Sequence, residues 1–295
     1  MNFLLGIDVG TSGTKTVLFD ESCKAIESCT IGYPLYQPLN GWAEQDPGDW
    51  WNAARDGISA VISGSGVPSS DIKGIGLSGQ MHGLVMLDAA GEVLRRSIIW
   101  CDQRTGKECE EITSRVGAGR PLALTANPAL TGFTASKILW VRNNEPEIYR
   151  HCAHILLPKD YIRYKLTGEF ATEVSDASGM QLLDVPGRCW SDEVLARLGI
   201  DGSLLGKVYE SPEVTGTVTA EAARLTGLAE GTIVVGGAGD NSAAAVGTGV
   251  VADGRAFTTI GRRLAGLAAF MSSLSMFASR IGTIFSSQRS ALSSP

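Results

Sequence analysis

A carboxylate and a glycine-rich turn follow directly on an apolar segment at the start of the chain, and this pattern constrains the fold most. Residues 3–7 are apolar enough to predict a buried strand, which ends at Asp8. Residues 10–13, Gly-Thr-Ser-Gly, then predict a tight turn, and residues 16–19 predict a second strand. We therefore expect the chain to begin with an antiparallel hairpin.

The turn of this hairpin has the composition of a phosphate-binding loop. Gly10 lets backbone N–H groups approach a phosphate closely, and the hydroxyl groups of Thr11 and Ser12 add hydrogen-bond donors. A carboxylate such as that of Asp8 can hold a hydrated Mg²⁺ ion beside the phosphate. The same residues also suit an ordinary glycine-rich hairpin, so at this point both interpretations of the motif stay open.

Composition favours a globular cytoplasmic protein and argues against two classes of partner. The chain has 295 residues, 44% of them hydrophobic and 19% charged, which is enough to form two ordinary domains with buried cores. The net charge of −6 argues against nucleic acid and against an anionic membrane surface as partners. The six cysteines include no CxxC pair, which favours reduced thiols over a disulfide framework or a zinc site. We expect no signal peptide.

Segments typical of strands and of helices alternate along the chain, and this alternation predicts an α/β fold. Further strands are predicted at residues 25–31, 73–77, 84–87, 97–100, 232–236 and 256–260. Helices are predicted at residues 47–63, from about residue 103, at 134–143 and at 159–166. Asp46 is the expected N-cap of the first helix, with Pro47 in its first turn.

Polar and aromatic residues gather where four of the predicted strands end. The clusters are Asp8 with the turn at 10–13; Gln80, Met81, His82 and Gly83; Trp100, Asp102 and Arg104; and Asp240 with Asn241. Carboxylates and amides that glycine-rich turns deliver to strand ends are the arrangement used by sugar sites in α/β folds.

Each of these clusters also has a structural explanation. His82 can be a histidine whose hydrogen bonds are satisfied within a polar loop, and Trp100 follows two isoleucines and can belong to the core. Asp240 and Asn241 can be turn residues, a common place for both residue types. The residues alone therefore leave the functional and the structural interpretations open.

Several longer segments, in this order, resemble the FGGY carbohydrate kinases, and most closely the xylulokinases among them. The phosphate hairpin of that family resembles GIDVGTSGTK, and its xylulokinase sugar loop resembles SGQMHG, where glycerol kinases carry Arg-Glu in place of Met81 and His82. GFTASKILWVRNN, residues 132–144, is similar to the signature segment of the family. LLPKDYIRYKLTGEF followed by SDASG is typical of it, and GGAGDN resembles its catalytic segment. The resemblance extends from about residue 3 to Gly261.

The resemblance implies the two-domain actin-like ATPase fold, in which each domain has a ribonuclease-H-like core. Residues 1–245 would form the N-terminal, sugar-binding domain, and residues 246–261 would contribute only the first strand or strands of the C-terminal, ATP-binding domain. Sugar would bind deep in the cleft on the first domain, with the ATP phosphates between hairpins from both domains.

The resemblance also implies an activity and assigns residues to it. The activity would be ATP-dependent phosphorylation of D-xylulose to D-xylulose 5-phosphate by a cytoplasmic enzyme that uses Mg²⁺ and forms a homodimer. Asp240 and Asp8 would be the catalytic residues, Asp240 as general base and Asp8 as holder of Mg²⁺ through water. The ketose would contact Met81, His82, Trp100, Asp240 and Asn241, and the ATP phosphates would lie near Gly10, Thr11, Ser12 and Lys15.

After Gly261 the chain departs from the family pattern. The family continues with a second phosphate hairpin of the form G-T-S-G, whereas Gly261 is followed by RRLAGLAAF. Residues 262–295 hold nine serines, four arginines and no acidic residue. We expect these residues to be a disordered tail translated out of frame. The alternative function is therefore that of a truncated, catalytically inactive fragment with at most weak sugar binding.

Overall fold

The computed structural model describes residues 1–117 and 124–258, which divide into two units. The first unit is Met1–Asp240, and the second begins at Asn241. Helix α10 (Asp240–Gly247) starts at this division, and residues 250–258 that follow it contain no helix or strand. The expected domain boundary after residue 245 stays a prediction, and the predicted tail at 262–295 lies outside the described residues.

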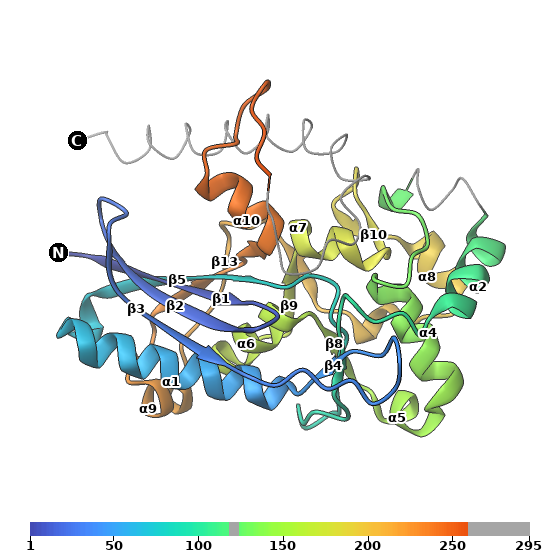
Figure 1. The fold of residues 1–295 in the computed structure, drawn as a ribbon, viewed down its shortest axis with the longest axis horizontal. Helices are drawn as coiled ribbons and strands as arrows, with labels where there is room; N and C mark the ends of the chain where they lie inside the picture. Colours follow the sequence, from blue (N-terminus) through green and yellow to red (C-terminus); the bar gives the residue numbers. More distant parts are fainter. Residues whose placement is uncertain (118–123, 259–295) are drawn as a thin grey trace. The chain divides into compact units, whose positions relative to one another are not determined.

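A mixed sheet occupies the centre of the first unit (Figure 1). Its strands are β1 (Phe3–Val9), β2 (Gly13–Asp20), β3 (Ala25–Gly32), β5 (Ile72–Gly79), β13 (Val214–Thr217), β14 (Ile233–Val235) and β15 (Ala238–Gly239). They lie in the order β13-β14-β5-β1-β2-β3, and β15 also pairs with β5. β1, β2 and β3 are antiparallel neighbours, whereas β1, β14 and β15 all run parallel to β5. The predicted amino-terminal hairpin is confirmed.

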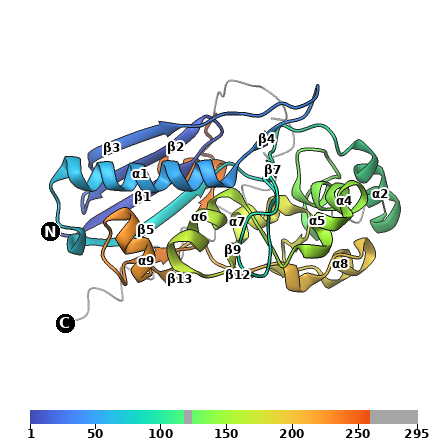
Figure 2. The same ribbon diagram turned by 90° about the horizontal axis from the view of Figure 1, so that it is seen from below.

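Three helices cover one face of this sheet: α1 (Pro47–Ser65), α6 (Pro158–Thr167) and α9 (Ala220–Thr226) (Figure 2). Side chains alternate along a strand, so Leu5, Ile7 and Val9 of β1 are buried while Leu4 and Asp8 are exposed. α1 begins where predicted, because the Asp46 side chain accepts a hydrogen bond from the N–H of Gly48 at 2.8 Å.

A second hydrophobic cluster of the first unit is built from the helices α2 (Gly106–Val116), α4 (Thr134–Asn144), α5 (Pro146–His151) and α8 (Asp192–Leu198). The short strands β6 (Val85–Leu87) and β8 (His154–Leu156) border it, and its buried members include Leu84, Ile112 and Leu198. The remaining elements are β4 (Glu44–Gln45), β7 (Ser97–Ile98), β9 (Ala171–Glu173), α7 (Val174–Ala177), β10 (Leu183–Asp184), β11 (Cys189–Trp190) and β12 (Lys207–Tyr209). The described residues of the unit also contain 3-10 helices at Ser69–Asp71, Ser178–Met180 and Gly202–Leu204.

One predicted strand is wrong over the part that the structure describes. Residues 256–258, the described part of the strand expected at 256–260, form neither helix nor strand. Their apolar sequence satisfies a local pattern, but a strand also needs a neighbouring strand to bond its backbone, and none is provided for this segment within the described ranges. We also find no helix in residues 1–117 and 124–258 whose length and apolar character would let it cross a bilayer.

The turn that leads into β15 requires glycine at position 237. Gly237 has φ +75°, and a Cβ atom there would lie 2.9 Å from the carbonyl carbon of Leu77 in β5. Gly231 has a similar φ of +82°, but a Cβ atom there would meet nothing within 4 Å.

These two glycines form a matched pair of substitutions. We expect Gly231→Ala to lower the free energy of unfolding by about 1 kcal/mol, because only the backbone conformation is penalised. Gly237→Ala adds a clash with β5, and we expect a loss of about 3 kcal/mol or more. Urea unfolding of both variants measures the difference, and equal losses would mean that the close approach to β5 is unimportant.

Candidate functional site

Three parallel strands of the sheet end at the same level, and the polar residues predicted from the sequence follow them. The register pairs Val9 of β1 with Gly79 of β5, and Gly79 with Gly239 of β15. The next residues along these strands are Gly10, Gln80 and Asp240. The structure therefore brings the turn at residues 10–13 (the phosphate turn), the loop at 80–83 and Asp240 to one edge of the sheet, where the carboxyl ends of the strands lie. Ligands of α/β sheets bind at this edge.

The glycine turn is closed by a hydrogen bond from the N–H of Gly10 to the carbonyl of Gly13 at 3.1 Å. A Cβ atom at position 13 would lie 2.6 Å from the carbonyl oxygen of Ile31, so glycine lets β3 approach the turn. Ser12 is exposed at its tip. The turn thus exposes the hydroxyl group of Ser12, whereas the N–H of Gly10 is used to close it.

Asp8 lies exposed at the end of β1, beside Lys15 and Ser78. Lys15 stands directly opposite it in the β1–β2 ladder, so both side chains occupy the same face of the sheet. Asp8 Oδ1 accepts a hydrogen bond from Ser78 Oγ at 2.6 Å. The described residues contain no group of three His, Cys, Asp or Glu side chains that could hold a metal by themselves. The donor set at Asp8 suits Mg²⁺, which commonly takes one or two carboxylates and completes its shell with water and phosphate oxygens.

Two buried amides that the sequence analysis left without a role hold the phosphate turn in place. Gln45 Nε2 donates to the carbonyl of Thr11 at 2.8 Å, and Gln80 Nε2 donates to Gln45 Oε1 at 2.8 Å. The side chain of Thr11 is also engaged, since its hydroxyl accepts from the indole N–H of Trp100 at 2.9 Å and donates to Gln80 at 3.4 Å. Trp100 therefore reaches the site through Thr11, with its ring half-buried.

His82 has an unusual backbone conformation within the loop at 80–83, with φ +69°. Its Nδ1 lies 2.9 Å from the carbonyl oxygen of Gly179, and its ring packs edge-on against Phe133 at 4.6 Å. Because a carbonyl only accepts, we assign the ring proton to Nδ1, which leaves Nε2 as an acceptor. Burial, and after it the charge of Lys137, lowers the pKa of His82 to about 3, so the ring is neutral near pH 7.

Met81 is buried against the glycine that precedes Asp240. A Cβ atom at Gly239 would lie 2.9 Å from Met81 Cγ, and a Cβ atom at Gly179 would lie 3.3 Å from Met81 Cε. The two glycines thus allow the loop at 80–83 to pack closely on β15 and on the 3-10 helix Ser178–Met180. The side chain of Met81 therefore packs against the residue that precedes Asp240.

Ser175 holds the backbone directly before Asp240 through a hydrogen bond. Ser175 Oγ accepts from the N–H of Gly239 at 3.1 Å and donates to Glu173 Oε1 at 2.8 Å. Glu173 also accepts from the hydroxyl of Ser211 at 2.9 Å. Asp240 itself is exposed, and Asn241 follows it as the first residue of the second unit, so its sugar contact stays a prediction.

Glu173 belongs to a fully buried ionic cluster whose other members are Lys159, Asp160, Arg163 and Asp176. Lys159 Nζ lies 2.6 Å from Asp160, 3.4 Å from Glu173 and 3.3 Å from Asp176. Burial raises the pKa of Asp176 well above its ordinary value. Lys159 and Arg163 together offset the charge of Asp160 and Glu173, and the raised pKa favours the neutral form of Asp176.

Asp102 and Arg104, which were predicted to cluster with Trp100, have a structural role. Arg104 pairs with Asp102 at 2.7 Å and with Glu44 at 2.8 Å, and its guanidinium group lies 3.6 Å from the ring centroid of Trp42. Its side chain is 1% exposed. Asp102 and Arg104 therefore hold the segment after β7 in place, and their charged groups bond other residues of the protein.

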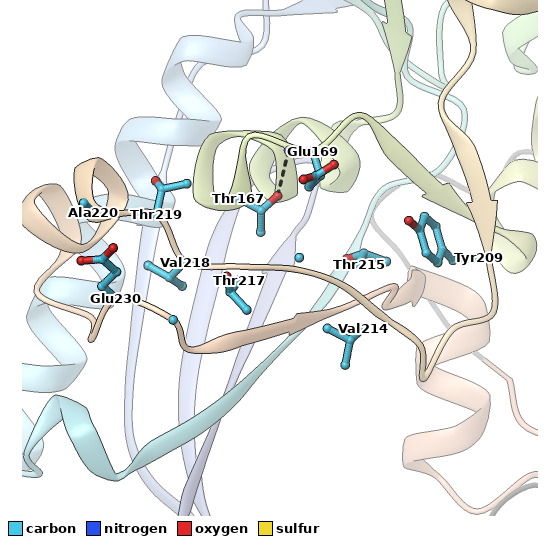
Figure 3. Close-up of a pocket in the computed structure, with 12 residues that line it drawn as sticks. Thr167, Glu169, Tyr209, Val214, Thr215, Thr217, Val218, Thr219, Ala220 and Glu230 are labelled. Atoms are coloured by element: carbon cyan, nitrogen blue, oxygen red, sulfur yellow. Dashed lines mark hydrogen bonds between the residues drawn. The ribbon is translucent and has the colours of Figure 1, made fainter.

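A groove of about 640 Å³ lies elsewhere in the first unit (Figure 3). Glu230 and Gly231 at its rim precede β14, so they lie at the amino end of the parallel strands, away from the edge that carries Asp240. Two of its four threonine hydroxyls donate within the protein: Thr167 Oγ1 to the carbonyl of Arg163 at 2.9 Å, and Thr215 Oγ1 to that of Val234 at 3.1 Å. The groove is thus separate from the candidate site.

The neutral state of His82 has a measurable consequence. The unfolded ring takes up a proton below about pH 6.5, whereas the folded ring does so only near pH 3. Between these values the unfolded state binds more protons, so the free energy of unfolding falls as the pH is lowered. We expect urea unfolding between pH 7 and pH 4 to show a steeper fall for the unchanged protein than for His82→Gln. Identical slopes would contradict a neutral His82 ring in the folded protein.

Ser175 and Ser211 offer a matched pair, because both bond Glu173 and only Ser175 bonds Gly239. We expect Ser175→Ala to leave the N–H of Gly239 without its partner and to accelerate its hydrogen exchange. We expect Ser211→Ala to leave that exchange rate unchanged. Amide exchange followed by NMR measures both, and an unchanged rate in Ser175→Ala would remove Ser175 as the anchor.

Comparison with known proteins relates this site to one family. The family model described as FGGY family of carbohydrate kinases, N-terminal domain, matches residues 3–247. The chain is 40% identical over 261 residues to the xylulose kinase of Bacillus subtilis (strain 168), a match that covers 88% of this chain and 52% of that protein. It is 42% identical over 257 residues to the xylulose kinase of Escherichia coli (strain K12), covering 87% and 52%.

Among solved structures, the xylulose kinase from Rhodospirillum rubrum matches with a TM-score of 0.81 and 32% identity over 84% of this chain and 51% of that chain. The chain spans about half the length of the curated relatives it matches. The predicted α/β class, with the first domain of the actin-like ATPase fold, is confirmed. Since the family model covers every strand that carries the site, the chain belongs to the FGGY family of carbohydrate kinases.

Proposed function

We propose that this chain is the sugar-binding part of a kinase that transfers the γ-phosphoryl group of ATP to D-xylulose and forms D-xylulose 5-phosphate. The observation that carries the proposal is the meeting of the phosphate turn, His82 and Asp240 at one sheet edge. Similarity to the xylulose kinases of Bacillus subtilis and Escherichia coli supports the choice of substrate. Location in the cytoplasm and a homodimer stay predictions.

In this proposal the ketose lies between the loop at 80–83 and Asp240. The neutral imidazole of His82 accepts a hydrogen bond from a sugar hydroxyl at Nε2, which is possible because Gly179 holds the ring proton at Nδ1. Met81, Trp100 and Asn241 provide further contacts to the sugar. A site with a fixed acceptor discriminates between a hydroxyl and a group that cannot donate.

The phosphate turn serves the nucleotide. The backbone at Gly10, the groups of Thr11 and Ser12, and the ammonium group of Lys15 lie near the ATP phosphates, and Asp8 holds Mg²⁺ through water. When bound, Mg²⁺ neutralises charge on the phosphate oxygens. The hydroxyl of Thr11 is already engaged with Trp100, so its contribution comes from the backbone.

Asp240 acts as the general base. The sugar hydroxyl oxygen forms the new bond to the γ-phosphorus, the bond from that phosphorus to the ADP oxygen breaks, and the hydroxyl proton passes to the Asp240 carboxylate. In a loose transition state the proton is lost late, so the main task of Asp240 is to orient the hydroxyl. The anchor from Ser175 to Gly239 supports that orientation.

Asp240→Asn tests this assignment. The amide can still bond the sugar hydroxyl but cannot take its proton. We therefore expect turnover to fall about 10²–10⁴-fold when the substitution is made in a full-length kinase that contains both domains. Coupled ADP release with ATP, Mg²⁺ and D-xylulose measures turnover, and calorimetry measures D-xylulose binding, which we expect to change less than about tenfold. Asp253→Asn, at an exposed acid of the second unit, is the control. Near-normal turnover in Asp240→Asn removes Asp240 from the mechanism, and no D-xylulose binding by the unchanged chain contradicts the substrate.

A further inference from the structure

Helix α4 directs a fully buried lysine at the loop that carries His82. Lys137 Nζ donates to the carbonyl oxygen of His82 at 2.7 Å and to that of Gly132 at 2.7 Å. Thr134, one turn earlier in α4, donates from its hydroxyl to the same His82 oxygen at 3.2 Å. The side chains of Lys137 and Thr134 are both 0% exposed. One carbonyl of the loop therefore has two dedicated side-chain donors.

Both the ring and the backbone carbonyl of His82 are held by contacts with other residues. Its ring bonds Gly179 and packs on Phe133, while its carbonyl bonds Lys137 and Thr134. These contacts surround a backbone at φ +69°, which residues with a Cβ atom rarely adopt. A conformation of this kind persists only where its surroundings impose it.

A lysine at position 137 carries a cost in free energy, because burial desolvates its ammonium group. Its neighbours Ile138, Leu139 and Val141 are buried in the second hydrophobic cluster, where an apolar side chain would pack without desolvating a charge. Burial lowers the pKa of Lys137 to about 7, although the nearby charge of Asp102 opposes this shift. What an apolar residue cannot supply is the pair of hydrogen bonds to the two carbonyls.

We infer that Lys137 and Thr134 are positioning residues: they fix the His82 carbonyl, and with it the direction in which the imidazole Nε2 faces the sugar. Gly83 adds to this restraint, since a Cβ atom there would lie 2.6 Å from Pro158 Cγ, so the loop is packed tightly just after His82. The inference rests on the proposed function for the identity of the sugar and for its contact with His82.

Lys137→Met tests the inference, because methionine keeps the apolar stem and cannot donate. We expect the ¹³C shift of the His82 carbonyl to move and the ring signals of His82 to change. We also expect D-xylulose affinity to fall about tenfold, because the imidazole of His82 is then no longer held in the direction that meets the sugar. Leu139→Ala, at a buried position of the same helix whose side chain cannot donate a hydrogen bond to the loop, is the control for general destabilisation. We expect it to leave both readouts unchanged.

Thr134→Val and Thr134→Ser provide the second test and replace the first if Lys137→Met does not fold. Valine keeps the shape but loses the hydroxyl, whereas serine retains it. We expect the valine variant to move the His82 carbonyl shift and the serine variant to restore it. Unchanged His82 signals in folded Lys137→Met or Thr134→Val overturn the inference. If the unchanged protein binds no D-xylulose, the substrate proposal fails, and the His82 signals still decide the role of Lys137 and Thr134.

Discussion

The pairing of β15 with the carboxyl end of β5 is the contact on which the candidate site depends. Two residue pairs, Ala238 with Ser78 and Gly239 with Gly79, bring Asp240 to the same edge as the phosphate turn. This short pairing is possible because Gly237 adopts φ +75° against the backbone of β5. A strand of two residues has little stability of its own, so the contacts around it have to hold it in register.

Buried polar side chains make several of those contacts, and they bond the backbone of glycine-rich segments. Ser175 and the ionic cluster around Lys159 support Gly239, while Gln45 and Gln80 support the phosphate turn. Lys137 does the same for the carbonyl of His82. Buried polar networks are costly when incomplete and rigid when satisfied. The glycines allow close approach, and hydrogen bonds from buried side chains hold the backbone at Gly239, at Thr11 and at His82.

This construction suits phosphoryl transfer, in which the protein acts chiefly by positioning groups. His82, Asp8 and the backbone before Asp240 are each held by a hydrogen bond from or to a neighbouring residue. Gly179 sets the tautomer of His82, Ser78 bonds the carboxylate of Asp8, and Ser175 bonds the residue before Asp240. A substitution in this supporting set is therefore expected to alter geometry at the edge without removing any group that faces it.

The sequence by itself determined what local patterns encode: the hairpin, the helix start at Asp46, the alternation of strands and helices, and the family. The expected strand at 256–260 was wrong over 256–258, because a strand needs a partner that a local pattern does not specify. Only the tertiary structure decided the roles of Gln45, Lys137 and Ser175, since their hydrogen bonds join residues 34 to 64 positions apart. Contacts at such separations depend on how the strands and helices pack, which the order of residues along one segment does not express.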